Sequence, residues 1–373
     1  MRNPLLNPLR NIVVLEEAPR GNLGEWSELY ALGYLLAHGG AYEADEQQNS
    51  DPRAFHSVKE IWLPRDNSFN SQHFLVENSE AAIHWDSVEV QRVSKSMIEA
   101  ALEEMLEELA LKSNRGTFPL DAGSQLLKLL MKNSVSANSN SKTNDLEVVF
   151  QDLDTGATTP RVGFSIKSQL GARSTLLNAS QATNFTYKIL SKNPRDEFQF
   201  PVFIHGKHKQ NLNRLINAGY SLEFHKVKSE IFNRNLTKID MQFPAILARV
   251  LLHSYITGQD NFAKATQSIF QGDDLVSEQS VFKLKEFLGA VAMGLRPSTI
   301  WRGKTTTFNG MLIVKSSGEI VFNYLNEIKN FEEYLFNSVS FERPSTSRHK
   351  YGHIYENQGE SYIDLNLQIR FLK

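Results

Sequence analysis

The chain has 373 residues, 41% of them hydrophobic and 22% charged, with a formal net charge of −2 at pH 7; this is typical of a globular protein with a well-packed core. It has no cysteine, so disulfides and cysteine-ligated zinc are excluded, and this fits a reducing cytoplasm. No stretch approaches the roughly 20 apolar residues of a membrane helix, and residues 1–16 lack the apolar run of a signal peptide, so we expect a cytoplasmic protein with no membrane contact.

The first predicted helix covers residues 25–38. Its leucines recur at helical spacing, and Gly39 follows as a C-terminal stop. Glu28 lies on or beside this apolar stripe, where a glutamate at the edge of a core needs a partner. The alternative is a surface glutamate near a helix start, which the helix dipole favours.

A longer helix is predicted over residues 96–112. Its apolar stripe is the strongest in the sequence, and Ser96 with Glu99 predicts a capping box at its start. A shorter helix is predicted over residues 121–131. We therefore expect a largely helical insertion or subdomain over residues 40–132.

Residues 145–169 predict a β-hairpin with one polar face. Strand alternation separates the polar side chains from the apolar ones in both strands. On the polar face we expect Asp145, Glu147, Ser165, Lys167 and Gln169. If the strands pair symmetrically about Gly156, Asp145 lies directly opposite Lys167, with Cβ atoms roughly 5 Å apart.

A carboxylate opposite a lysine suits metal-dependent phosphodiester hydrolysis. Acidic oxygens hold a hard ion such as Mg²⁺, which polarises the phosphate and lowers the pKa of bound water. A lysine orients that water or neutralises charge that develops on the phosphate. The alternative is an ordinary cross-strand ion pair, worth under about 1 kcal/mol.

A second carboxylate is needed because Ser165 stands where many such sites carry an acid. Glu28 is the best candidate for this role. Glu25, one helical turn earlier, and Glu147 are the alternatives.

Charge is distributed unevenly along the chain. Residues 80–108 hold eight acids against one arginine and one lysine, whereas residues 188–238 hold ten lysines or arginines against four acids. The basic stretch permits a phosphate-binding surface on a nearly neutral protein. Ordinary solvated faces are the alternative.

The C-terminal part combines helices and strands. Helices are predicted over residues 244–255 and 281–293, a hairpin over 311–323 and an alternating strand over 361–371. This mixture predicts an α/β or α+β fold.

Six short motifs resemble one family. They are GEWSELY (24–30), GFSIKSQLG (163–171), TLLNAS (175–180), ATNF (182–185), RHKYG (348–352) and LQIR (367–370). Together they resemble the HpaII-type restriction endonucleases, a variant of the PD-(D/E)xK nuclease superfamily. The resemblance spans most of the chain, and residues 163–185 are its most specific part.

The resemblance implies a fold and an activity. The fold would be a restriction-endonuclease-like core, with a mixed central sheet flanked by helices and additional helical and β elements. The activity would be that of a type II enzyme that binds double-stranded DNA at a short palindrome, CCGG in the namesake. It would cut both strands with Mg²⁺ and leave 5′-phosphates. A palindromic target favours a twofold homodimer.

The resemblance also implies roles for particular residues. Asp145 and Glu28 would bind the metal, with the backbone carbonyl of Ile166 as a further ligand. Lys167 would assist the nucleophile, and Gln169 would support the site.

The chain departs from the common pattern of this superfamily twice. No proline precedes Asp145, and Ser165 replaces the acid. Both departures bear on the second metal ligand more than on the class of reaction.

Residues that read bases are harder to identify. Arginine or lysine reads guanine, and asparagine or glutamine reads adenine. Five residues just after the hairpin or in the basic stretch are candidates for DNA binding: Arg173, Asn178, Asn184, Lys207 and Lys209. Phosphate contact or plain solvation is the alternative for each.

We expect one elaborated nuclease over residues 1–373, whose helix 25–38 joins the catalytic core. Residues 145–240 would form the catalytic hairpin and the DNA-facing region, and residues 241–373 would form helices followed by strands. Two other functions remain open: a structure-selective repair or recombination nuclease, and a non-catalytic DNA-binding protein with a nuclease-like fold.

Overall fold

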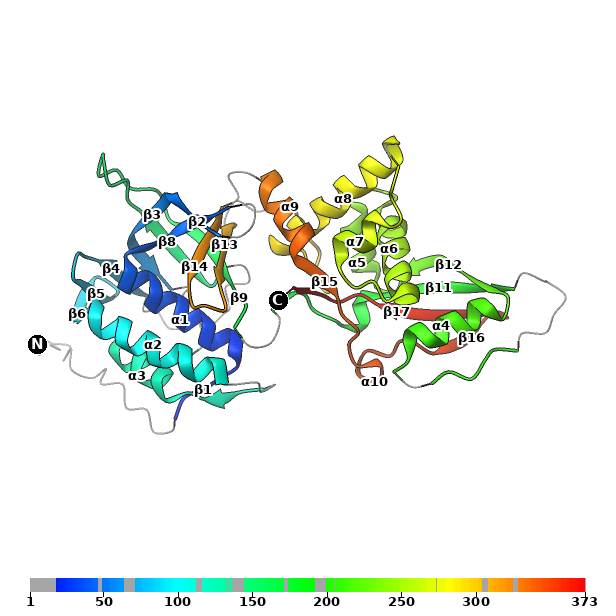
Figure 1. Ribbon diagram of the computed structural model, residues 1–373, viewed down its shortest axis with the longest axis horizontal. Coiled ribbons are helices and arrows are strands. Elements are labelled where there is room, and N and C mark those ends of the chain that lie inside the picture. Colours follow the sequence, from blue (N-terminus) through cyan, green and yellow to red (C-terminus); the bar gives the residue numbers. More distant parts are fainter. Residues whose placement is uncertain are drawn as a thin grey trace, which may run out of the picture. The chain divides into compact units, whose positions relative to one another are not determined.

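The computed structural model describes residues 18–45, 49–63, 71–111, 116–132, 134–135, 144–170, 174–191, 199–204, 206–272, 274–303, 308–324 and 328–372. The chain forms two compact units (Figure 1). The first comprises Met1–Ala172 and Thr306–Asn326, and the second comprises Arg173–Thr305 and Glu327–Lys373. This division differs from the ranges expected from the sequence, because two late strands return to the sheet of the first unit.

The first unit is built on a nine-stranded mixed sheet with the order β2-β14-β13-β9-β8-β3-β4-β5-β6. Its strands are β2 (Gly40–Ala44), β3 (Ser50–Trp62), β4 (Gln72–Val76), β5 (Glu80–Trp85), β6 (Val88–Ser94), β8 (Leu146–Phe150), β9 (Val162–Ser168), β13 (Phe308–Val314) and β14 (Ile320–Tyr324). The pairs β13–β9 and β14–β2 are parallel, and the other neighbours are antiparallel. The predicted hairpin over residues 311–323 is confirmed by β13 and β14.

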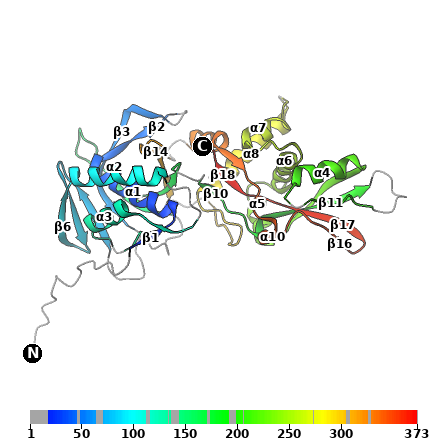
Figure 2. The same ribbon diagram turned by 60° about the horizontal axis from the view of Figure 1, so that its bottom comes forward.

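Three helices share one hydrophobic core with the apolar face of this sheet (Figure 2). They are α1 (Leu23–His38), α2 (Lys95–Leu111) and α3 (Asp121–Leu129), and a two-stranded sheet of β1 (Arg20–Gly21) and β7 (Phe118–Pro119) lies in the same unit. The predicted alternation in the hairpin is confirmed, because Leu146, Val148 and Phe164 belong to this core.

Helix α1 begins with a capping box that the sequence analysis missed. The Asn22 side chain accepts a hydrogen bond from the Glu25 N–H at 3.1 Å, and the Glu25 carboxylate accepts one from the Asn22 N–H at 2.7 Å. These bonds satisfy two donors that a helix start otherwise leaves unpaired. Gly39 ends the helix with φ of +71°, as predicted from its position.

Two expectations for residues 40–132 are wrong. This range is not largely helical, because it supplies strands β2 to β6 as well as α2 and α3. Buried and exposed residues do not alternate regularly in strands such as β3 and β6, so the sequence pattern does not reveal these strands. The capping box of Ser96 with Glu99 is also absent from this start: α2 begins at Lys95, directly after β6, and the Met97 N–H donates to Ser94 Oγ at 3.3 Å.

The second unit contains two antiparallel sheets and several helices. The sheet order is β12-β11-β17-β16 in one and β10-β18-β15 in the other. The strands are β10 (Thr175–Leu177), β11 (Asn184–Ser191), β12 (Tyr220–Val227), β15 (Val339–Phe341), β16 (Ile354–Asn357), β17 (Glu360–Asn366) and β18 (Ile369–Phe371). The helices are α4 (His208–Asn217), α5 (Glu230–Thr237), α6 (Phe243–Thr257), α7 (Phe262–Gln267), α8 (Leu275–Ala292), α9 (Ile328–Ser338) and α10 (Thr346–His349), with a 3₁₀ turn over Gln181–Thr183. The predicted helices over 244–255 and 281–293 correspond to α6 and α8.

The single strand predicted over residues 361–371 is wrong. The chain leaves one sheet after Asn366 and enters the other at Ile369. The buried Asn366 amide donates to Ser180 O at 2.7 Å and to Asn184 Oδ1 at 2.6 Å. The strict alternation of apolar residues therefore does not mark a single strand, because it continues where the chain passes from one sheet to the other.

The mixed sheet with flanking helices confirms the predicted α+β class. Within the described ranges, no helix is long and apolar enough to cross a membrane.

The packing of Gly123 against Trp26 gives a stability prediction. A Cβ added at Gly123 in α3 would lie 2.4 Å from Cζ3 of the fully buried Trp26. In an exposed helix, alanine is about 1 kcal/mol more favourable than glycine. Here we expect Gly123→Ala to lower the free energy of unfolding by about 1–3 kcal/mol, because an overpacked core must shift. Urea denaturation measures this difference.

The control is Gln125→Ala, an exposed position on the same helix. It should change the free energy of unfolding by less than about 0.5 kcal/mol. A Gly123→Ala protein as stable as the parent would contradict this packing.

Candidate active site

The register of the β8–β9 hairpin differs from the predicted one. Leu146 pairs with Phe164, and the same register places Asp145 across from Ser165. The prediction that Asp145 lies directly opposite Lys167 is therefore wrong by two residues.

The turn explains this shift. The Asp152 carboxylate accepts hydrogen bonds from the N–H groups of Asp154 and Thr155 at 3.0 and 2.7 Å, which closes a turn ahead of Gly156. The second strand also has one more residue than the first between the bridge Gln151–Thr158 and the first regular pair of the ladder. An extra residue on one strand is a β-bulge, and this one moves the register one residue back toward the predicted pairing, which leaves the observed shift of two.

Asp145 and Lys167 are nevertheless brought together through Ser165. Ser165 Oγ donates to Asp145 Oδ2 at 3.0 Å and accepts from Lys167 Nζ at 3.0 Å. The Ile166 N–H also donates to Asp145 Oδ2, at 2.6 Å. A carboxylate, a hydroxyl and an ammonium thus form one chain of charge-assisted hydrogen bonds.

This chain of hydrogen bonds lies where the two strands cease to pair. Asp145 comes just before β8, and its N–H donates to Phe164 O at 2.8 Å. The side chains of Asp145 and Lys167 are half-buried, and Ser165 is 8% exposed. The apolar residues of the hairpin anchor its other face in the core, so the polar groups are held on a rigid element.

Helix α1 is fixed to the end of β9 by two buried serines. The hydroxyls of Ser27 and Ser168 are hydrogen-bonded at 2.8 Å, and Ser168 Oγ also accepts from the Leu170 N–H at 3.0 Å. Glu28 follows Ser27 directly and is half-buried. No local sequence pattern predicts this serine pair, because the two residues are 141 positions apart.

The two alternative carboxylates have different surroundings. Glu25 is engaged in the capping box of α1, which explains it without a catalytic role. Glu147 shares the polar face with Asp145 and pairs with Gly163 on one side and Trp62 on the other.

The oxygens near Asp145 fit a hard divalent cation. Among the described residues, no three His, Cys, Asp or Glu side chains are grouped closely enough to hold a metal ion. Magnesium is commonly held by one or two carboxylates, with water completing its shell. The N–H and C=O of one strand residue point to the same side of the strand, so the Ile166 carbonyl lies on the side of β9 on which its N–H meets Asp145.

The other predicted site residues differ in their exposure and in their hydrogen bonds. The Gln169 N–H donates to Val314 O at 2.8 Å, which extends the β9–β13 pairing beyond the active-site residues. Asn178 and Lys207 are exposed, and Arg173 lies outside the described residues. Lys209 Nζ donates to Thr257 O at 2.5 Å, at the C-terminal end of α6.

Asn184 has a structural role in place of the predicted DNA contact. Its side chain is fully buried. Its amide nitrogen donates to His349 O at 3.0 Å, and its oxygen accepts from Asn366. The segment containing His349 is thereby tied to β11, which the sequence alone did not reveal.

Comparisons with known proteins agree with these observations. The family model of the HpaII restriction endonuclease matches residues 22–371. The type II restriction enzyme HpaII of Haemophilus parainfluenzae is 37% identical over 358 residues, which cover 94% of this chain and 98% of that enzyme. No solved structure matches the chain. The resemblance inferred from the six motifs is confirmed, and the chain belongs to the HpaII restriction endonuclease family.

Proposed function

We propose that this protein is a type II restriction endonuclease that hydrolyses phosphodiester bonds in double-stranded DNA at a specific site. Membership of the HpaII restriction endonuclease family supports this proposal. The main support for it is the link from Asp145 through Ser165 to Lys167. This link brings a carboxylate and an ammonium group together on one rigid hairpin.

The finer features of the activity are part of the same proposal. The target is a short palindrome similar to CCGG, the cofactor is Mg²⁺, and the products carry 5′-phosphates. A palindrome presents the same sequence to two subunits related by a twofold axis, so the protein acts as a homodimer. The cysteine-free composition fits action in the cytoplasm.

Asp145, Glu28 and the Ile166 carbonyl hold the metal in this proposal. Asp145 contributes the carboxylate that the hairpin fixes, and the Ser27–Ser168 contact sets the position of α1, on which Glu28 lies. Bound Mg²⁺ supplies Lewis-acid polarisation of the phosphate and a lower pKa for its bound water. Ser165 takes the strand position of the usual acid, so Glu28 supplies the second carboxylate.

Lys167 orients the attacking water and balances the negative charge that develops on the phosphate. Its ammonium donates to the Ser165 hydroxyl, which in turn donates to Asp145. Gln169 supports the site because its backbone extends the β9–β13 pairing beyond Lys167.

We expect Lys167 to act in the reaction and not in DNA binding. Lys167→Ala should bind DNA with the affinity of the parent protein but cut plasmid DNA at least about 100-fold more slowly, since one charge-stabilising donor is worth roughly that factor. Gel analysis of plasmid cleavage and a binding titration measure the two quantities. Lys128→Ala, at an exposed position on α3, is the matched control and should cut normally. Equal cleavage by the Lys167→Ala protein would remove Lys167 from the site.

The metal dependence distinguishes the carboxylates. Asp145→Asn and Glu28→Gln should each raise the Mg²⁺ concentration at which cleavage reaches half its maximal rate, because each removes a charged ligand. Glu25→Gln alters the capping box of α1 and should leave the midpoint of the Mg²⁺ titration unchanged. Normal Mg²⁺ dependence in Glu28→Gln, together with a shift in Glu147→Gln, would assign the second acid to Glu147.

The Ser165 hydroxyl gives a third test of the site. A hydrogen bond to a charged group is worth about 1.5–3 kcal/mol, so Ser165→Ala should slow cleavage about 10- to 100-fold. Ser165→Thr retains a hydroxyl and should recover part of the rate. An unchanged single-turnover rate in Ser165→Ala would show that Lys167 does not depend on this contact.

A further inference from the structure

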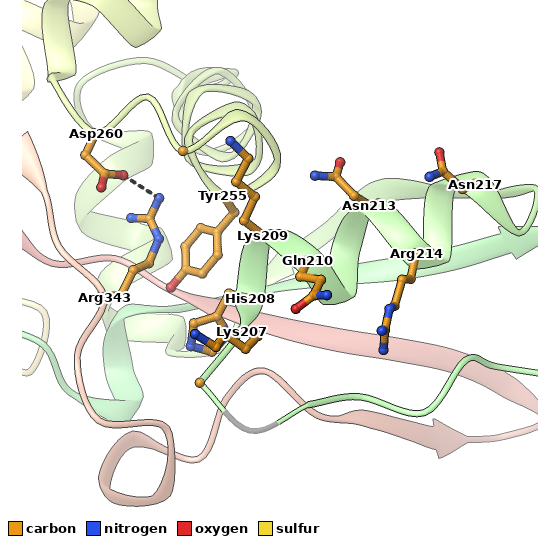
Figure 3. Close-up of a pocket in the computed structure, with 12 residues that line it drawn as sticks. Lys207, His208, Lys209, Gln210, Asn213, Arg214, Asn217, Tyr255, Asp260 and Arg343 are labelled. Atoms are coloured by element: carbon orange, nitrogen blue, oxygen red, sulfur yellow. Dashed lines mark hydrogen bonds and ion pairs between the residues drawn. The ribbon is translucent and has the colours of Figure 1, made fainter.

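The second unit contains a cavity of about 620 Å³ beside helix α4 (Figure 3). This volume lies in the usual range of ligand sites. Four cationic side chains line it, namely Lys207, Lys209, Arg214 and Arg343, against one carboxylate, Asp260. The surplus of positive charge favours an anionic ligand.

The lone acid is already neutralised. Arg343 Nη2 donates to Asp260 Oδ1 at 2.7 Å and to Ser254 Oγ at 2.7 Å. The Arg343 guanidinium also lies 3.9 Å from the centre of the Tyr255 ring. Its other terminal nitrogen, Nη1, is buried and has no acceptor among the described residues.

Two cationic side chains that line the cavity are exposed. They belong to Lys207, the N-cap residue just before α4, and to Arg214 on α4, and Gln210 lies between them in Figure 3. Arg214 Nη1 donates to Val202 O at 3.5 Å. Lys209 and Asn213 donate to the carbonyls of Thr257 and Ile256 at the end of α6, and these two bonds fix α4 to α6.

The start of α4 adds to this positive character. Lys207 is its N-cap residue and makes no side-chain capping bond. The helix dipole therefore adds partial positive charge to the same end of the cavity. The cavity is also lined by Gln210 and Asn217, whose uncharged amides can donate hydrogen bonds without adding negative charge.

We infer that this cavity binds the phosphodiester backbone of DNA. The inference rests on the proposed function, which supplies DNA as the substrate, and it extends DNA contact to Arg214 and Arg343, which the sequence analysis did not select. Lysine and arginine at phosphates determine affinity and its salt dependence without reading sequence. The cavity therefore positions DNA and does not select the target.

The test is a binding titration without divalent ions, in which no DNA is cut. Duplex DNA would be titrated at several salt concentrations against the full-length protein, Lys207→Gln, Arg214→Gln and the double variant. Both residues are exposed, so the variants should fold normally. Lys128→Gln on α3 is the control for loss of one positive charge.

Each variant should weaken binding to target and non-target duplexes by the same factor. The slope of log affinity against log salt should fall by about 1 for each charge removed. The control should change neither quantity. Parental affinity and slope in the double variant would overturn the inference.

A small anion is the alternative occupant. If inorganic phosphate at constant ionic strength raised the melting temperature of the parent but not of the double variant, and the DNA affinities were equal, the cavity would be a small-anion site and the inference would be wrong. Because the titration does not require cleavage, weaker DNA binding by the variants would support DNA binding at the cavity even if the parent never cut DNA. Conversely, if the parent cuts DNA at a specific site and the variants bind DNA normally, only the inference about this cavity is overturned.

Discussion

The proposed active site depends on one hydroxyl, that of Ser165, which joins the Asp145 carboxylate to the Lys167 ammonium. The register of the hairpin does not place the acid and the lysine directly opposite each other, so their relation depends on this link. A serine in this place keeps the two charged groups close, yet it removes one carboxylate from the usual ligand set. In the proposed site the second acid is Glu28 on α1, a helix that is held against β9 by the buried pair Ser27–Ser168.

The two compact units contribute differently to the proposed activity. The first holds the reactive groups on a nine-stranded sheet whose apolar face packs against three helices. The second holds a cationic cavity in which Arg343 is fixed by Asp260 and Tyr255. In the proposed activity, the chemistry would depend on hydrogen bonds within the first unit, whereas DNA affinity would depend on charges in the second.

The sequence predicted local features better than the pairing of distant segments. The polar face of the hairpin was predicted correctly because strand alternation is local. Its register was not, because the Asp152 turn and a bulge are set by hydrogen bonds to the backbone. The strands within residues 40–132 and the division into units depend on pairing between distant segments. Asn184 was misread as a DNA contact, since the sequence does not show that its amide is buried against Asn366.

Sequencing the ends of plasmid DNA after incubation with the protein and Mg²⁺ tests the central claim most directly, because it reports activity, target and cut position together. We expect discrete fragments that all end at one short palindrome and carry 5′-phosphates that ligase can join. Cleavage only at branched DNA, random ends, or no cleavage at any Mg²⁺ concentration would contradict it.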